Sequence, residues 1–195
     1  LPISDADISV GDARQALREA TRLTFDRIDS DGCMSTNDSV ILMVSGASGV
    51  RVPTAEFTAR LTRACTDLAR HLIADAEGAS KQIAISVQEA ATEDDAVEAG
   101  RAIARSNLVK CAMYGQDPNW GRVLSALGST SITFDPDHVD VAMNGVWVCR
   151  GGSVGDDRAL VNLDEPEVEI KVRLGVGLAS ATILTNDLTA EYVRE

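Results

Sequence analysis

The spacing of apolar residues predicts amphipathic helices along much of the first half of the chain. An apolar face recurs at helical spacing from Asp12 to Ile28, and it ends at the turn sequence 29–32. Thr54 is placed to cap a second, longer helix, and Thr92 to cap a third that reaches Arg105. The first part of the chain is therefore expected to be rich in helix.

Strand patterns interrupt these helices and dominate the end of the chain. The run Val40–Val44 is typical of a buried strand, and apolar residues alternate over 83–87 as in a half-buried strand. Asn144-Gly145 is a strong hairpin signal between strands expected at 139–143 and 146–149. Further strands are expected at 132–134, 168–174 and 181–184.

The segment 106–122 places a polar turn, residues 115–119, between two apolar runs. The run 108–114 has the length of a strand, and the residues after Asn119 follow a helical pattern. Pro118 has a fixed φ and pushes Asp117 into an extended conformation. Asn119 can then cap the helix. Free backbone N–H groups gather at a helix start, so such a turn can bind a ligand, although a purely structural role is the simpler interpretation.

Composition and charge narrow the class of protein. A net charge of -12 and few clusters of Lys and Arg argue against nucleic acid or an anionic membrane as a partner. No apolar run approaches the roughly 20 residues that cross a bilayer, and no signal peptide opens the sequence, so a cytoplasmic location is expected. The fold class is expected to be α/β, as one unit over 1–195 with a helix-rich lobe 1–128 and a strand-rich lobe 129–195.

Residues that commonly bind metals or act as bases are scarce. The four cysteines show no metal-ligand spacing, and three lie in apolar or helical runs, which favours reduced, buried thiols. The two histidines, His71 and His138, have surroundings typical of the surface. We therefore expect no metal and no organic cofactor. Asp29, Asp31 and Asp38 resemble a metal site most, and a solvated acidic turn is the simpler interpretation.

Two polar positions adjoin the predicted elements. Residues 35–38 carry small hydroxyl and amide side chains, which suggest a loop facing a pocket, although such side chains commonly bond their own backbone. Glu77 lies at a helix-to-strand junction, where Gly78 can adopt positive φ and end the helix. The helix dipole destabilises a carboxylate at this position by roughly a few tenths of a kcal/mol, and a bound cation offsets that cost. A solvated Glu77 near Lys81 is the alternative.

Five separated motifs occur in the order found in one enzyme family. They are Ser35-Thr36-Asn37-Asp38, Asp75-Ala76-Glu77-Gly78, Leu108-Val109-Lys110, Gly115 with Asp117-Pro118-Asn119-Trp120-Gly121-Arg122, and Thr185 to Val193. From about Asp12 onward the chain resembles the β chain of the ornithine acetyltransferases of arginine biosynthesis, also called bifunctional glutamate N-acetyltransferases. Five motifs in order are far more specific than any one of them.

The resemblance implies a function and a partner. In that family one precursor cuts itself before a threonine, and the two pieces stay together as α and β chains in a hetero-oligomer of α/β pairs. The freed threonine takes an acetyl group from N2-acetylornithine and passes it to glutamate, and some members also accept acetyl-CoA. An N-terminal threonine can use its own α-amine as the base, so no histidine is needed. The implied fold is an N-terminal-nucleophile-like arrangement of mixed α/β layers.

The resemblance also implies roles for individual residues. Glu77 matches the substrate-binding glutamate of the family, which would hold the cationic amine of ornithine through a charge-assisted hydrogen bond. Because Leu1 is not the family's threonine, we expect the nucleophile upstream of Leu1 and the substrate-binding tail beyond Glu195. Supporting roles are expected for Ser35, Thr36, Asn37, Asp38, Asp117, Asn119 and Arg122. For the last three, which lie in the turn, a scaffold role is the alternative to contact with the substrate.

Two other functions remain open. A related N-terminal-nucleophile aminopeptidase or hydrolase would share the self-cleaving architecture but lack the Asp-Pro-Asn-Trp-Gly-Arg turn. A non-catalytic module would have kept the fold and lost the nucleophile. A threonine encoded just before Leu1 would favour the acyltransferase subunit over the non-catalytic module.

Overall fold

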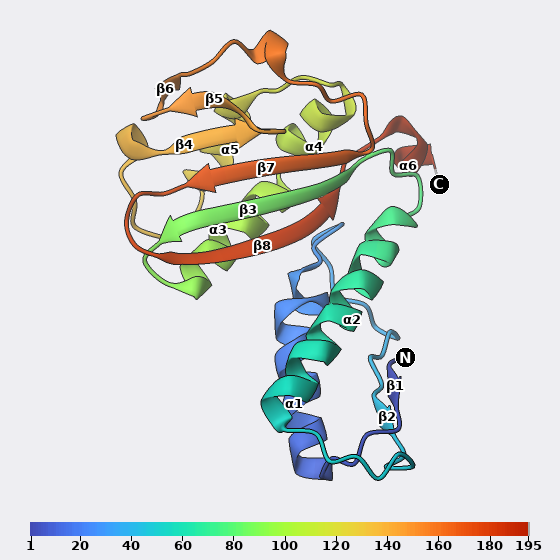
Figure 1. Cartoon of the computed structure of the whole chain (residues 1–195). Helices are drawn as coiled ribbons and strands as arrows, with labels where there is room; N and C mark the ends of the chain where they lie inside the picture. The colour runs from blue at the N-terminus through green and yellow to red at the C-terminus, as the bar shows by residue number, and fades with distance from the viewer. Residues whose placement is uncertain (195) are drawn as a thin grey trace. The chain divides into compact units, whose positions relative to one another are not determined.

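The computed structural model describes residues 1–194 as a mixed α/β protein, as expected for the fold class (Figure 1). The chain forms two compact units, each with its own hydrophobic core. The first unit contains residues 1–28 and 33–72, and the second contains residues 29–32 and the chain from residue 73 onward.

These two units do not match the expected lobes 1–128 and 129–195. Strand β3 (Gln82–Ala90) precedes residue 128, yet it pairs with β7 (Glu167–Arg173) and β8 (Ala179–Asn186) in one sheet. The expected division is wrong because strand pairing joins residues that are far apart in the sequence.

The first unit is built on α1 (Val10–Leu23) and most of α2 (Thr54–Ala74). Ser9 Oγ accepts a hydrogen bond of 3.1 Å from the backbone N–H of Asp12, so α1 begins two residues before its expected start and ends at Leu23. A 3₁₀ turn, η1 (Phe25–Arg27), follows. The buried core of this unit consists of Ala6, Ala16, Ala20, Phe57, Leu61 and Cys65.

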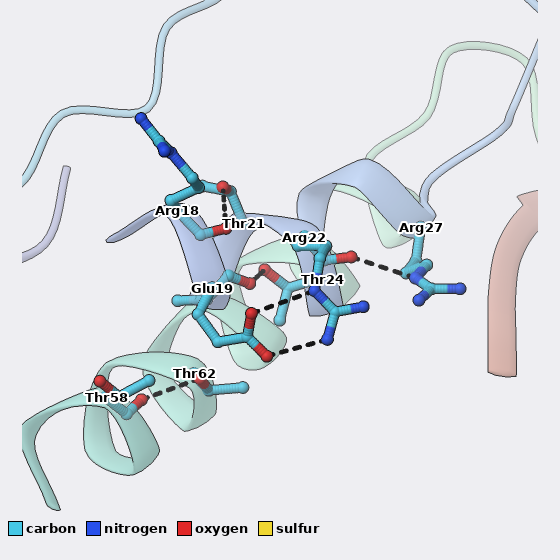
Figure 2. Close-up of polar contacts among 9 residues, drawn as sticks. Arg18, Glu19, Thr21, Arg22, Thr24, Arg27, Thr58 and Thr62 are labelled. Atoms are coloured by element: carbon cyan, nitrogen blue, oxygen red, sulfur yellow. Dashed lines mark hydrogen bonds and ion pairs between the residues drawn. The ribbon is translucent and has the colours of Figure 1, made fainter. Parts of the chain in front are cut away.

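Several polar side chains on α1 and α2 form hydrogen bonds within their own helix. Figure 2 shows the Thr62 hydroxyl donating to the carbonyl oxygen of Thr58, at 2.8 Å, and Arg22 donating to both carboxylate oxygens of Glu19 at 3.0 and 2.8 Å. Such bonds leave the hydroxyl satisfied without a partner on another element, so threonine is tolerated on a half-buried helix face.

The strand expected over 40–44 is wrong in extent. Only β2 (Met43–Val44) is a strand, and it pairs in parallel with β1 (Ile3–Ser4) over two residues. Ile41 and Met43 are more than half exposed. An apolar run becomes a stable strand only where neighbouring strands pair along its length, and within this unit the neighbour is two residues long.

The second unit contains a six-stranded sheet in the order β6-β5-β4-β7-β3-β8 (Figure 1). The central strands β3 and β7 are parallel, and the other pairs are antiparallel. The strands expected at 83–87, 168–174 and 181–184 are confirmed, whereas 132–134 is not a strand. The remaining bounds are β4 (Asp140–Met143), β5 (Val146–Arg150) and β6 (Ser153–Val154).

Helices α3 (Glu93–Arg105), α4 (Asn107–Tyr114) and α5 (Trp120–Leu127) lie along one face of this sheet (Figure 1). Alternation along β3 buries Ile83, Ile85 and Val87 against them. Gly100 lets α3 approach the sheet closely, because a Cβ there would lie 2.6 Å from Cγ1 of Ile183 on β8. The short elements η2 (Pro136–His138), η3 (Arg158–Leu160) and α6 (Ala190–Arg194) complete the unit.

The strand expected at 108–114 is wrong, because these residues form α4. Ser106 Oγ accepts a hydrogen bond from the N–H of Val109 and caps the helix. A short apolar run fits a buried helix as well as a buried strand, and only the cap distinguishes them in the sequence. The helix α5 begins after Asn119 as expected, but the Asn119 side chain does not cap it.

Other local predictions are confirmed. Thr92 caps α3 through a hydrogen bond of 3.1 Å from the N–H of Asp95. Asn144 and Gly145 have φ values of 45° and 84°, both positive as a type I′ hairpin requires. His71 and His138 are exposed.

Burial of the cysteines is confirmed only in part. Cys65 and Cys149 are buried, whereas Cys33 and Cys111 are exposed, and none of the four forms a disulfide bond within the described residues. Cys111 is exposed because its run is helical and one side of α4 faces away from the sheet. None of the helices between residues 1 and 194 combines the length and apolar character needed to cross a membrane.

Candidate functional site

A cavity of about 350 Å³ in the second unit is lined by charged residues of both signs. The loop between α2 and β3 contributes Glu77 to its wall, and α3 and α4 contribute cationic residues. Side chains that line it include Asp31, Glu77, Arg105, Asn107, Lys110 and Tyr192.

Glu77 has the freest carboxylate in this wall. It is exposed, and among residues 1–194 it forms no hydrogen bond or ion pair. The helix α2 ends at Ala74, three residues earlier, so the unfavourable effect of the helix dipole on Glu77 is weaker than the sequence suggested. The Glu77 carboxylate is therefore available to a cationic ligand.

Lys81 does not neutralise Glu77. Its ammonium is buried and donates three hydrogen bonds to the carbonyl oxygens of Leu163, Asp164 and Glu165, at 2.6, 3.1 and 3.0 Å. These three bonds use every donor of the ammonium, so none is left for the Glu77 carboxylate. The exposure of Glu77 is compatible with the alternative of a solvated carboxylate.

The loop that carries Glu77 is fixed by side chains from the end of β8. The Asp187 carboxylate accepts hydrogen bonds of 2.9 Å from the backbone N–H groups of Ser80 and Lys81, and a further bond from the Ser80 hydroxyl. The Asn186 amide donates to the carbonyl oxygens of Ile73 and Lys81, at 2.9 and 3.0 Å. Both side chains are buried.

Gly78, beside Glu77, is held against α6. The Thr189 hydroxyl donates to the Gly78 carbonyl oxygen, and the N–H of Tyr192 donates to the Thr189 hydroxyl at 3.0 Å. The φ of Gly78 is +63°, as expected, and a Cβ at this position would lie 2.7 Å from the backbone nitrogen of Tyr192. Only glycine satisfies both the conformation and the contact.

A buried ammonium, that of Lys110, closes the cavity on the side of α4. Its Nζ donates to the carbonyl oxygens of Ser30 and Asn186, at 2.6 Å each, and to the Thr185 hydroxyl at 3.1 Å. Burial lowers the pKa of Lys110, while the charge of Asp187 opposes that shift. Three oxygen acceptors match the three donors of an ammonium, so every donor of Lys110 is used within the fold.

Asp29 forms an ion pair rather than part of a metal site. Its buried carboxylate accepts a hydrogen bond of 2.8 Å from Nε of Arg105, and Nε of Arg101 lies 3.9 Å away. Asp38 belongs to the first unit. Among the described residues, no three His, Cys, Asp or Glu side chains are grouped so that they could hold a metal ion.

The polar loop 35–38 lies in the first unit, and the side chains of Ser35, Thr36 and Asn37 form hydrogen bonds within the loop. Ser35 Oγ accepts hydrogen bonds from the N–H groups of Asn37 and Asp38, at 3.2 and 3.0 Å. The Thr36 hydroxyl donates to Oδ1 of Asn37 at 2.7 Å. A supporting role for these residues in a site stays a prediction.

The turn 117–122 is not among the segments that line the cavity. Asn119 donates from Nδ2 to Asp117 at 3.0 Å, and Arg122 donates from Nη1 to the Leu108 carbonyl oxygen at 2.7 Å. Arg122 thereby ties α5 to α4. These contacts favour a scaffold role for Asp117, Asn119 and Arg122.

Lys110, Asn186 and Asp187 lie in two of the five family motifs, but no role in a site was predicted for them. The sequence held a signal for Lys110, because a lone lysine within an apolar run is buried only if hydrogen-bond acceptors surround its ammonium. No local signal existed for Asn186 and Asp187, because their partners lie more than 100 residues earlier.

Comparison with known proteins gives consistent matches along the chain. The sequence profile of the ArgJ family matches residues 2–195. The arginine biosynthesis bifunctional protein ArgJ of Thermobifida fusca is 60% identical over 192 residues, which are 98% of this chain and 50% of that protein. The protein of the same name from Mycobacterium tuberculosis is 47% identical, over 98% of this chain and 48% of that protein.

A solved structure gives the same result for the fold. The crystal structure of arginine biosynthesis bifunctional protein ArgJ from Bacillus halodurans matches with a TM-score of 0.94 and 34% identity, over 99% of this chain and 95% of that chain. The chain spans about half the length of the curated relatives it matches.

Proposed function

Because the chain belongs to the ArgJ family, we propose that it is the β-chain portion of a self-processed acyltransferase that moves an acetyl group from N2-acetylornithine to glutamate. The observation that carries this proposal is the exposed, unpartnered Glu77 carboxylate in the wall of the cavity. A carboxylate placed this way suits the ammonium group of ornithine.

The reaction proceeds in two steps on a threonine that precedes Leu1. The threonine hydroxyl oxygen attacks the acetyl carbonyl while the α-amine of the same residue takes the hydroxyl proton. The amide C–N bond breaks, the proton passes to the leaving nitrogen, and ornithine departs from an acetyl-threonine ester. The amine of glutamate then attacks that ester, which yields N-acetylglutamate and restores the hydroxyl. Acetyl-CoA is a further candidate donor for the first step.

The partner in this proposal is the α chain of the same precursor, in a hetero-oligomer of α/β pairs. Support comes from the length of the relatives, of which this chain matches about half. In the first unit, Leu1, Ile3, Ile41 and Met43 are more than half exposed, which leaves apolar surface for another chain to cover. The cytoplasmic location expected from the sequence stays a prediction.

Substitution of Glu77 tests the site. In the full-length protein, Glu77→Gln keeps the shape of the side chain and removes its charge. If the ammonium and carboxylate are desolvated together, kcat/KM for transfer from N2-acetylornithine to glutamate falls by at least about tenfold. Self-cleavage of the precursor, followed on a gel, continues at the normal rate because it needs no amine substrate.

A nearby carboxylate supplies the matched control. Asp75 is exposed and lies two residues before Glu77, but it does not line the cavity. Asp75→Asn therefore leaves transfer unchanged. Equal transfer by wild type and Glu77→Gln, with both proteins processed, would contradict the assignment of Glu77.

A further inference from the structure

We propose that Asp187 is a positioning residue that fixes the Glu77 loop, residues 75–81, for binding of the substrate ammonium. The inference rests on the proposed function and deepens it. Glu77 forms no hydrogen bond or ion pair with another described residue, so the path of its backbone determines where its carboxylate lies.

Asp187 holds the far side of this loop. Its carboxylate is buried and accepts from the N–H groups of Ser80 and Lys81 and from the Ser80 hydroxyl. Without Asp187, two adjacent backbone N–H groups would lose their acceptor, and the loop would have to move to regain one from water. Glu77 lies three residues before the first of these N–H groups.

The neighbours of Asp187 complete the attachment. Asn186 bonds to carbonyl oxygens at both ends of the loop, on Ile73 and Lys81. Thr189 bonds to the carbonyl oxygen of Gly78, directly after Glu77. The segment 186–189 therefore contacts the loop at its start, middle and end, and Asp187 is its only charged member.

A competing role for Asp187 is direct contact with the substrate, because it also lines the cavity. The two roles differ in what Asp187→Asn does. Asparagine keeps one carbonyl oxygen for the Ser80 and Lys81 N–H groups, and its amide can donate to the Ser80 hydroxyl. A positioning role survives this change, whereas a direct ion pair with an ammonium does not.

The experiment measures kcat and KM for N2-acetylornithine in the full-length protein and in Asp187→Asn, Asp187→Ala, Glu77→Gln and the double variant Asp187→Ala/Glu77→Gln. We expect Asp187→Ala to raise KM at least about tenfold, and Asp187→Asn to stay within about threefold of wild type. In the double variant the Asp187 effect disappears, because it acts through a charge that is no longer there.

Thr189→Val provides a second variant for the case that Asp187→Ala does not fold, as judged by self-cleavage and Tm. It removes the hydrogen bond to Gly78 with little change in shape, and we expect a rise in KM in the same direction, with normal processing. Unchanged KM in Thr189→Val would then overturn the inference.

Other results separate the two proposals. Equal losses in Asp187→Asn and Asp187→Ala, or additive losses with Glu77→Gln, would overturn the positioning role while leaving the proposed function intact. A Glu77→Gln variant with wild-type transfer would instead overturn the role of Glu77, and with it the inference.

Discussion

Lys110 donates a hydrogen bond of 2.6 Å to the carbonyl oxygen of Ser30, which lies 80 residues earlier in the chain. The same ammonium holds the backbone of Asn186, so one buried charge links the segment 29–32, α4 and the end of β8. The shape of the cavity wall therefore depends on a residue that need not touch a substrate.

Removal of this charge should destabilise the protein. Lys110→Met leaves the carbonyl oxygens of Ser30 and Asn186 buried without a donor, which is expected to cost about 2–4 kcal/mol. Thermal unfolding of the full-length protein measures the loss. Lys171 is the control, because its ammonium pairs at the surface with Glu169 at 3.5 Å, and Lys171→Met should change stability by less than about 0.5 kcal/mol. Equal Tm values for the two variants would contradict the structural role of Lys110.

The same residue gives a prediction for pH. Burial lowers the pKa of Lys110 in the folded protein below its ordinary value of 10.5. Between the two pKa values the unfolded chain binds more protons, so the contribution of Lys110 to stability rises with pH in that window. The free energy of unfolding of wild type minus that of Lys110→Met should therefore increase as the pH rises toward 10.5. A decrease over this range would show that the pKa is not lowered.

Gly78 should be irreplaceable for two separate reasons. Gly78→Ala is strained by a φ of +63° and also places a Cβ 2.7 Å from the nitrogen of Tyr192. Gly46 has a φ of +69° with nothing within 4 Å of a Cβ, so Gly46→Ala isolates the conformational cost, about 1 kcal/mol. We expect a larger loss of stability in Gly78→Ala, together with reduced acetyl transfer. Equal effects of the two substitutions would contradict the contact with α6.

The four cysteines should fall into two pairs by reactivity. Burial raises the pKa of the Cys65 thiol and of the Cys149 thiol, and both side chains are shielded, whereas Cys33 and Cys111 are exposed. Alkylation of the native full-length protein, followed by mass spectrometry of peptides, should leave Cys65 and Cys149 unmodified until the protein is unfolded. Labelling of either one at the rate of Cys33 would contradict the burial.

Local patterns predicted much of the second unit. The alternation in β3 and β7, the cap at Thr92 and the hairpin at Asn144-Gly145 each depend on residues close together in the sequence. The same reasoning failed for 108–114, where an apolar run fits helix and strand equally well, and for 40–44, where the neighbouring strand is short. Propensity cannot decide between such alternatives without knowledge of the partner segment.

The candidate site was predictable only at Glu77, and there through the family motif. Its position depends on Asp187 and Asn186, whose side-chain hydrogen bonds to Ile73, Ser80 and Lys81 join residues 105 to 113 positions apart in the sequence. No spacing rule connects residues so far apart. The turn 117–122 was the most conspicuous motif, yet its polar side chains bond within the turn and to α4 and Arg158, and none lines the cavity.

The most direct test of the central claim is the mass of the enzyme during turnover. The full-length, processed protein is incubated with N2-acetylornithine, quenched, and measured intact and as peptides. The proposed function predicts that the chain containing residues 1–195 gains one acetyl group on a threonine before Leu1, with release of ornithine, and that added glutamate removes this group as N-acetylglutamate. Turnover without an acetylated chain, or an acetyl group located within residues 1–195, would contradict it.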